Sequence, residues 1–167
     1  MTRHRRAAGC APTCEEDRAP IADLLRRIGL FGENEVAVAL EVLDVYLFQE
    51  GQEDYRFFSA FSGGEVAGYV CFGLNSMTQG TFELYWIAVD PSSLRQGLGS
   101  DLLERAERES LLQGCRKMAV ETSSRRDYAP ALSFYRRHGY RVAARVPDFY
   151  APGDDKLILV KDFPPCS

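Results

Sequence analysis

The stretch that decides the fold of this chain is Ile87-Ala-Val-Asp-Pro-Ser-Ser-Leu-Arg-Gln-Gly-Leu-Gly-Ser100. Its apolar start continues a strand, an Asp-Pro pair ends that strand, and two glycines flank the beginning of a helix. The unpaired N–H groups and the dipole of a helix N-terminus attract anions. Gly97 and Gly99 let the main chain approach a phosphate closely, and Arg95 adds a positive charge. The stretch therefore predicts a strand–loop–helix site for a phosphorylated ligand.

Two widespread phosphate-binding loops do not match this stretch. A dinucleotide-binding loop has a third glycine, and Leu102 stands at that position. A Walker-type loop ends in Gly-Lys-Ser or Gly-Lys-Thr, and neither tripeptide follows here. Because an ordinary strand-to-helix turn also uses glycine, the two glycines alone are a weak signal and need a second motif beside them.

That second motif is Ala131-Leu-Ser-Phe-Tyr-Arg-Arg-His-Gly-Tyr140. The two stretches, in this order, resemble motif A and the later Tyr-containing motif of the Gcn5-related N-acetyltransferase (GNAT) superfamily. Motif A is most similar to that of the ribosomal-protein N-terminal acetyltransferases, and the resemblance covers residues 66–145. One departure is Leu94, which replaces the Gln or Arg that begins the family's loop pattern. Phosphate binding depends mainly on backbone N–H groups, so the departure concerns one side-chain contact.

The resemblance implies that acetyl-coenzyme A is the cosubstrate. It assigns main-chain pairing with the pantetheine arm to Ile87, Ala88 and Val89. The pyrophosphate is assigned to the loop and the first helical turn, which comprise Arg95, Gln96, Gly97, Leu98, Gly99 and Ser100. A related family often has an Asn that touches the cofactor seven residues before the motif's Tyr. Tyr128 occupies that position here, so the contact is missing or replaced.

Three side chains are candidates for the chemistry. The resemblance places Tyr135 near the coenzyme A sulfur, where a phenol that is protonated at neutral pH can donate to the departing thiolate. An acceptor ammonium must lose a proton before it attacks, and a carboxylate is the usual base. Glu83 and Glu121 stand where two branches of the family have theirs, and which of them acts, if either does, stays open. A main-chain N–H near Val89, at the family's strand bulge, is the expected oxyanion donor.

The acceptor is not named by the sequence. Residues 147–156 are similar to the hairpin that lines the acceptor groove of protein N-terminal acetyltransferases, which makes Phe149 and Tyr150, with Asp154 and Asp155, candidate acceptor contacts. An ordinary hairpin is the alternative for this segment. The other expected wall is the helix over residues 31–48. The alternative for the whole chain is a non-catalytic acyl-CoA-binding regulatory domain, which would need none of the three catalytic candidates.

The hydrophobic pattern predicts one domain over residues 1–167, with elements in the order β-α-α-β-β-β-α-β-α-β-β. Hairpin-linked strands followed by a β-α-β unit predict an α/β fold with a mixed sheet, and the resemblance makes this a GNAT fold splayed between two parallel strands. The predicted strands cover residues 3–9, 55–61, 66–74, 81–89, 117–122, 140–146 and 157–160. The predicted helices follow a capping box at 13–16 and begin near 33, 99 and 129.

Composition excludes several partners. A net charge of −4 argues against nucleic acid, whose binding requires a surplus of Lys and Arg. No apolar run approaches the roughly 18 residues of a membrane span. Five irregularly spaced cysteines favour the reduced thiols of a cytoplasmic protein, and too few histidines accompany them for a metal site. Three phenylalanines on one strand, at positions 57, 58 and 61, predict aromatic surface for a homodimer.

Overall fold

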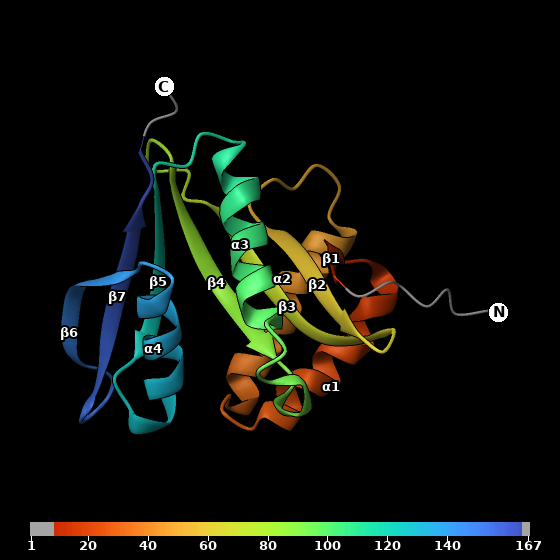
Figure 1. The fold of residues 1–167 in the computed structure, drawn as a ribbon, viewed down its shortest axis with the longest axis horizontal. Helices are drawn as coiled ribbons and strands as arrows, with labels where there is room; N and C mark the ends of the chain where they lie inside the picture. Colours follow the sequence, from red (N-terminus) through yellow and green to blue (C-terminus); the bar gives the residue numbers. More distant parts are fainter. Residues whose placement is uncertain (1–8, 165–167) are drawn as a thin grey trace.

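A seven-stranded sheet organises the chain, with the strands in the order β1-β2-β3-β4-β5-β7-β6 (Figure 1). The structure is a computed structural model that describes residues 9–164. The strands are β1 (Gly9–Pro12), β2 (Arg56–Ser62), β3 (Glu65–Leu74), β4 (Thr81–Val89), β5 (Lys117–Ser123), β6 (Arg141–Ala151) and β7 (Asp154–Asp162). Within the described residues, β4 and β5 are the parallel pair and the other neighbours run antiparallel.

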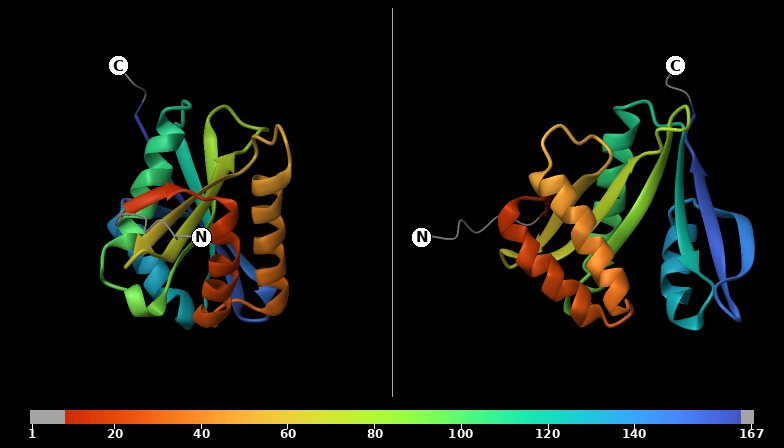
Figure 2. Two further views of the ribbon diagram at one scale, coloured as in Figure 1. Left: turned by 90° about the vertical axis from the view of Figure 1, so that its right-hand side faces the viewer. Right: turned by 180° about the vertical axis from the view of Figure 1, so that it is seen from behind.

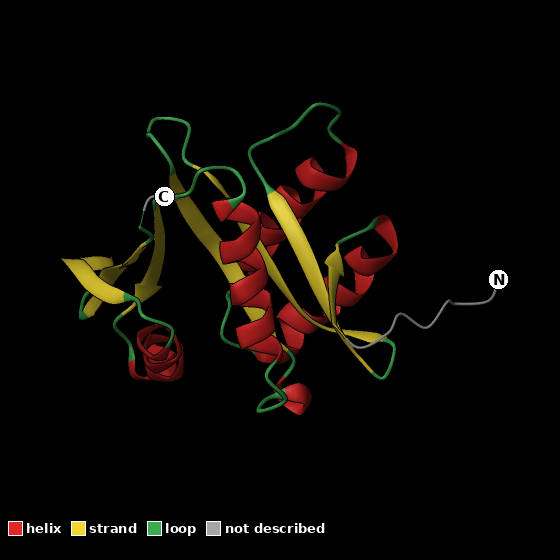
Figure 3. Ribbon diagram, turned by 45° about the horizontal axis from the view of Figure 1, so that its top comes forward, coloured by secondary structure: helices red, strands yellow, loops and turns green. Residues whose placement is uncertain are grey.

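Four α-helices cover the two faces of the sheet (Figure 3). They are α1 (Arg18–Ile28), α2 (Glu33–Phe48), α3 (Leu98–Leu111) and α4 (Ala129–Arg137). One buried cluster lies between the sheet and α3 and α4, and a second lies between the sheet and α1 and α2. The predicted order of helices and strands is confirmed, with a mixed sheet as expected.

The N-terminal predictions need two corrections. The predicted strand near residues 3–9 lies almost wholly outside the described residues, and the strand that the structure shows begins at Gly9. The capping box is centred on Cys14 and not on Thr13, because the N–H of Cys14 donates to Asp17 Oδ2 at 3.0 Å. Thr13 cannot cap, since its hydroxyl is buried against that of Ser59 at 2.8 Å.

The phenylalanines of β2 are absorbed by the two cores. Phe57 and Phe61 pack on the α1 and α2 side, and Phe58 packs on the α3 side. Their exposed fractions are 1%, 4% and 7%, so the aromatic surface that was expected to join a homodimer is not available on this strand. The turn after β2 is a two-residue hairpin as predicted, with Gly63 and Gly64 both at positive φ (61° and 86°), the combination that a type I′ turn requires.

The two parallel strands diverge part-way along their length (Figure 2). Their pairing runs from Thr81 opposite Lys117 to Leu84 opposite Val120 and then stops. At this point β4 has a bulge, because Leu84 and Trp86 pair with adjacent residues of β3 and Tyr85 is left over. The splay is therefore confirmed, but the bulge lies at Tyr85 and not near Val89.

The C-terminal hairpin is longer than predicted. β6 continues through residues 147–150 to Ala151, so Phe149 and Tyr150 belong to a strand, and the turn that joins β6 to β7 contains Gly153. In residues 9–164 no helix has the length and apolar character needed to cross a bilayer.

Candidate active site

The loop after β4 is held in place by Asp90. Its Oδ1 accepts hydrogen bonds from the N–H and the hydroxyl of Ser92 at 2.9 and 2.7 Å, and its Oδ2 accepts from Arg27. These bonds lower the pKa of Asp90 to about 2, with Ser92 contributing most and Arg27 less. The loop is tethered again where the Ser62 hydroxyl donates to Gln96 Oε1 at 3.2 Å. The main chain that precedes α3 is therefore fixed before any ligand binds.

The start of α3 leaves backbone donors available for an anion. Within the described structure no side chain caps the helix, and its first internal bond joins the Asp101 N–H to the Gly97 carbonyl. Gly97 (φ 81°) and Arg95 (φ 66°) are both in the left-handed region, a backbone arrangement that turns successive N–H groups toward one concavity. Uncapped donors beside a guanidinium fit a pyrophosphate.

The two glycines of this loop have different surroundings. A Cβ on Gly97 would meet nothing within 4 Å, so the protein itself requires glycine there for its positive φ. A Cβ on Gly99 would lie 3.4 Å from the Phe134 ring, an ordinary van der Waals contact, so packing against α4 does not by itself require glycine there. That both glycines make room for the pyrophosphate stays a prediction.

Ser100 and His138 connect the first turn of α3 to the end of α4. His138 Nδ1 lies 2.8 Å from the Phe134 carbonyl, which can only accept, so this nitrogen carries the proton. In the neutral ring Nε2 then accepts from the Ser100 hydroxyl at 3.0 Å. Ser100 was expected only as a phosphate contact and His138 was missed. The sequence signal for His138 was its place in the second motif, where it follows Phe134 by four residues and so lies on the same helix face.

The stretch Ile87–Val89 has one edge without a strand partner. On one side these residues pair with Gly68–Val70 of β3. On the other side, the described pairing with β5 ends at Leu84. The backbone groups on that edge are therefore available to an extended ligand, and main-chain pairing with an amide-containing pantetheine arm fits them.

Tyr135 lies on α4 within the cluster that α3 and the sheet enclose. Only 5% of the residue is exposed, and its ring makes edge contacts with Phe134 and Tyr140 at centroid distances of 5.4 and 5.6 Å. Burial raises the pKa of the phenol, which keeps it protonated at neutral pH. The residue thus packs the core and keeps the proton that a general acid needs.

Glu83 and Glu121 lie on the face of the sheet opposite α3 and α4, because their neighbours in β4 and β5 alternate into that core. Their surroundings differ. Glu83 Oε1 accepts a hydrogen bond from Asn75 Nδ2 at 2.6 Å. Glu121 is 53% exposed and forms an ion pair with Lys156 at 2.6 Å. The carboxylate of Glu83 therefore accepts from a neutral amide, and the carboxylate of Glu121 is paired with an ammonium group.

The β6–β7 hairpin presents aromatic rings beside Glu121. Phe149 and Tyr150 are 52% and 48% exposed and form an edge-to-face pair with centroids 5.0 Å apart. Asp154 and Asp155 are buried, where Asp154 accepts from Ser123 and Asp155 accepts from Arg145. Asp154 thus joins the hairpin to β5, and Asp155 joins the two strands of the hairpin to each other, while the rings of Phe149 and Tyr150 stay exposed.

The chain matches the model of the acetyltransferase (GNAT) family over residues 21–140. Blasticidin-S acetyltransferase from Streptomyces morookaense is 39% identical to it over 114 residues, which are 66% of this chain and 76% of that protein. The chain belongs to the GNAT family. It is therefore an acetyl-CoA-dependent N-acetyltransferase.

Solved structures agree with this GNAT assignment. A GNAT acetyltransferase from Desulfovibrio desulfuricans is 35% identical with a TM-score of 0.86, and the match covers 93% of this chain and 99% of that one. The ribosomal-protein-S18-alanine N-acetyltransferase of Escherichia coli has a TM-score of 0.76 over 96% and 97% of the two chains. At 21% identity that likeness shows the fold and not the branch.

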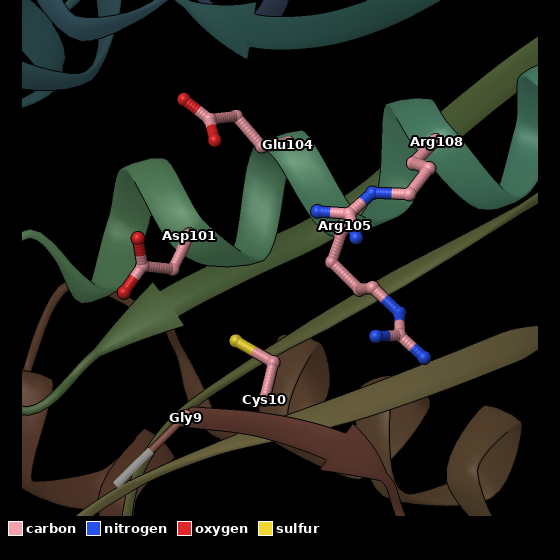
Figure 4. A pocket seen from close by; sticks show the side chains of 6 residues that line it. All are labelled: Gly9, Cys10, Asp101, Glu104, Arg105 and Arg108. Carbon is pink, nitrogen blue, oxygen red and sulfur yellow. The ribbon is translucent and has the colours of Figure 1, made fainter.

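The GNAT chain has a separate cavity of about 180 Å³ on the outer flank of α3 (Figure 4). Cys10 of β1 points toward the helix there, and Asp101, Glu104, Arg105 and Arg108 project from α3. Arg105 stacks on the Phe58 ring, with its guanidinium carbon 4.6 Å from the centroid. Burial raises the pKa of the Cys10 thiol, Asp101 raises it further, and Arg105 opposes them. None of the predicted site residues lines this cavity.

Proposed function

We propose that this GNAT enzyme transfers the acetyl group of acetyl-CoA directly to a primary amine of a small polar molecule. The observation that carries the proposal is the unpaired edge of β4 at Ile87–Val89, which leads to the uncapped start of α3. Together they fit the pantetheine arm and the pyrophosphate of one extended cosubstrate. The likeness to a blasticidin-S acetyltransferase supports a small-molecule acceptor.

In the proposed step the amine nitrogen attacks the thioester carbonyl carbon and the C–S bond breaks. Tyr135 donates its phenolic proton to the leaving thiolate, and water restores that proton afterwards. Glu83 takes the proton that the amine loses, since its carboxylate accepts from the neutral amide of Asn75, whereas that of Glu121 is engaged in an ion pair with Lys156. A covalent intermediate is not needed, and burial raises the pKa of the Cys71 thiol.

The test is the release of coenzyme A thiol from acetyl-CoA in the presence of blasticidin-S and, separately, of peptides with free N-termini. The peptides test the alternative that motif A suggests, an enzyme of the ribosomal-protein N-terminal acetyltransferase branch. We expect transfer to blasticidin-S and not to the peptides. Tight acetyl-CoA binding without transfer to any acceptor would instead support the non-catalytic regulatory domain.

The role of Glu83 is tested with Glu83→Gln on an acceptor that gives turnover. The rate should fall most near neutral pH, where almost all of the amine is protonated, and the loss should shrink as the pH rises. Glu121→Gln is the matched variant on the same face, and its kcat at saturating acceptor should keep the pH dependence of the wild type. A pH–rate profile of Glu83→Gln that superimposes on that of the wild type would remove Glu83 from the mechanism.

A further inference from the structure

The ammonium of Lys156 is held between a carboxylate and an aromatic ring. Lys156 lies on β7, where it pairs with Ser123 of β5 and Val146 of β6. Its Nζ is 2.6 Å from Glu121 Oε2 and 4.2 Å from the centroid of the Phe149 ring. A carboxylate and the face of an aromatic ring are the two groups that proteins use to bind alkylammonium ions. The structure therefore contains an alkylammonium site with a lysine of the same chain in it.

This site lies where the sheet opens. Glu121 is the first residue of β5 beyond the last parallel pair, Leu84 and Val120. It is therefore next to the place where the unpaired edge of β4 begins, which is the edge assigned to the pantetheine arm. The ammonium of Lys156 thus lies beside the opening through which an acceptor reaches the cosubstrate.

Acidic groups other than Glu121, the partner of Lys156, also surround the site. Burial raises the pKa of the neighbouring Tyr150, and Glu121, Asp154, Tyr128 and Glu35 raise it further. Glu35 also raises the pKa of Tyr128, after the larger effect of burial, while Arg125, whose guanidinium carbon is 5.7 Å from the centroid of that ring, lowers it. Because Glu35 belongs to the first turn of α2, the acidic groups approach the opening from both the α2 side and the hairpin side. Such surroundings favour a cation over a neutral or anionic ligand.

We propose that Glu121 and the Phe149 ring bind the ammonium group of the acceptor, and that Lys156 occupies this site until a cationic acceptor displaces it. The proposal rests on the proposed function, because it assigns a class of substrate, the alkylammonium compounds, to that enzyme's acceptor site. In this proposal Lys156 competes with the acceptor for the site, so removing the lysine side chain opens the site to the acceptor.

The chain has a matched control in Lys161. This residue also lies on β7, forms an ion pair with a glutamate (Glu107, 2.7 Å) and approaches the rings of Tyr140 and Phe163 at 5.7 and 5.3 Å. Five positions separate it from Lys156, so it projects from the other face of the strand, toward α3. Replacing Lys156 removes one ion pair and one cation–π contact, and replacing Lys161 removes one ion pair and two cation–π contacts, but only Lys156 faces the opening.

The experiment titrates the protein with n-butylammonium, and with 1-butanol as the uncharged probe, while NMR follows the aromatic resonances of Phe149 and Tyr150. Lys156→Met should bind n-butylammonium about three- to tenfold more tightly than the wild type, the range expected when a competing, partly buried ion pair with a cation–π contact is removed. Lys161→Met should bind it as the wild type does. Adding Glu121→Gln to Lys156→Met should abolish the gain.

Equal affinities of Lys156→Met and the wild type for n-butylammonium would overturn the proposal. A gain that 1-butanol shares would also overturn it, because it would show exposed apolar surface and not an ammonium site. Lys156→Gln, which keeps a polar side chain, replaces Lys156→Met if circular dichroism shows that the Met variant is unfolded. The titration contains no acetyl-CoA, so its result stands whether or not acetyl transfer is found.

Discussion

Arg27 and Asp90 join the last turn of α1 to the loop that precedes α3. Arg27 donates from Nε at 3.1 Å and from Nη2 at 2.6 Å, and both bonds end on Asp90 Oδ2. The Asp90 side chain is 13% exposed, and its other oxygen is taken by Ser92. A helix on one face of the sheet therefore fixes the backbone that begins the proposed pyrophosphate site on the other. In this proposal Asp90 acts on the cosubstrate through the loop and is a positioning residue.

We expect Asp90→Asn to raise the KM for acetyl-CoA several-fold and to leave kcat nearly unchanged. An amide cannot accept from Arg27 and Ser92 at both of its heavy atoms, so the loop loses one tether. Arg26→Met is the control. Arg26 is the neighbour of Arg27 in α1, and it forms an exposed ion pair with Asp23 of the same helix. Steady-state kinetics decide the matter, and a fall in kcat with unchanged KM would contradict a positioning role.

The same pair predicts how stability depends on pH. The carboxyl of Asp90 has a pKa near its ordinary 3.8 when unfolded and about 2 when folded. A lowered folded pKa means that the contribution to stability is complete above the unfolded pKa and is lost as the pH falls toward the folded value. Denaturant unfolding of the wild type and Asp90→Asn should therefore differ at neutral pH and converge between about pH 4 and pH 2. A difference that stays constant over this range would show that the carboxylate's charge is not involved.

Gly97 should be needed for its backbone conformation. Gly97→Ala forces a side chain into the left-handed region, which costs about 1–2 kcal/mol, and relieving that strain moves the loop. Gly114 is the matched control, because its φ is also 81° and a Cβ there would also meet nothing within 4 Å. Both variants should lose similar stability in thermal unfolding. Calorimetric titration with CoA should show weaker binding for Gly97→Ala alone.

Tyr135→Phe removes one hydroxyl and keeps the ring in the core. Turnover should fall by about 10²–10⁴-fold, the usual contribution of a general acid, while CoA affinity is retained. Tyr140→Phe is the comparison, since its hydroxyl donates to Glu107 Oε1 at 3.0 Å and belongs to the packing of the same cluster. That variant should lose stability and keep its turnover. Wild-type turnover in Tyr135→Phe would assign the residue to packing alone.

Tyr69 carries a hydroxyl whose removal should not destabilise the chain. The residue is 1% exposed, its ring stacks on Phe57, and its oxygen has no hydrogen-bond partner among residues 9–164. A buried polar atom without a partner costs about 1–3 kcal/mol. Tyr69→Phe should therefore raise the thermal midpoint, in contrast to Tyr140→Phe. A lower midpoint would show that the Tyr69 hydroxyl is satisfied in solution.

The parts of the fold that depend on near neighbours in the chain were predictable. The turn at Gly63 and Gly64 needs only two residues that tolerate positive φ, and Gly97 marks the start of α3 for the same reason. Thr13 shows where this reasoning stops. Its local pattern is a capping box, but a buried bond to Ser59, which is distant in the chain, takes its hydroxyl.

The sequence by itself determined the order of the elements, the strand–loop–helix at Ile87–Ser100 and the family, because each depends on residues that are close together in the chain. Only the tertiary structure decided where β4 and β5 separate, that Asp90 is held by Arg27, and that Lys156 lies against Glu121. Each of these pairings joins residues from different elements, and no periodicity within one element encodes a partner in another. The position and surroundings of the proposed acceptor site are set by the packing of the strands, while the chemistry of the proposed cosubstrate loop is set by its own residues.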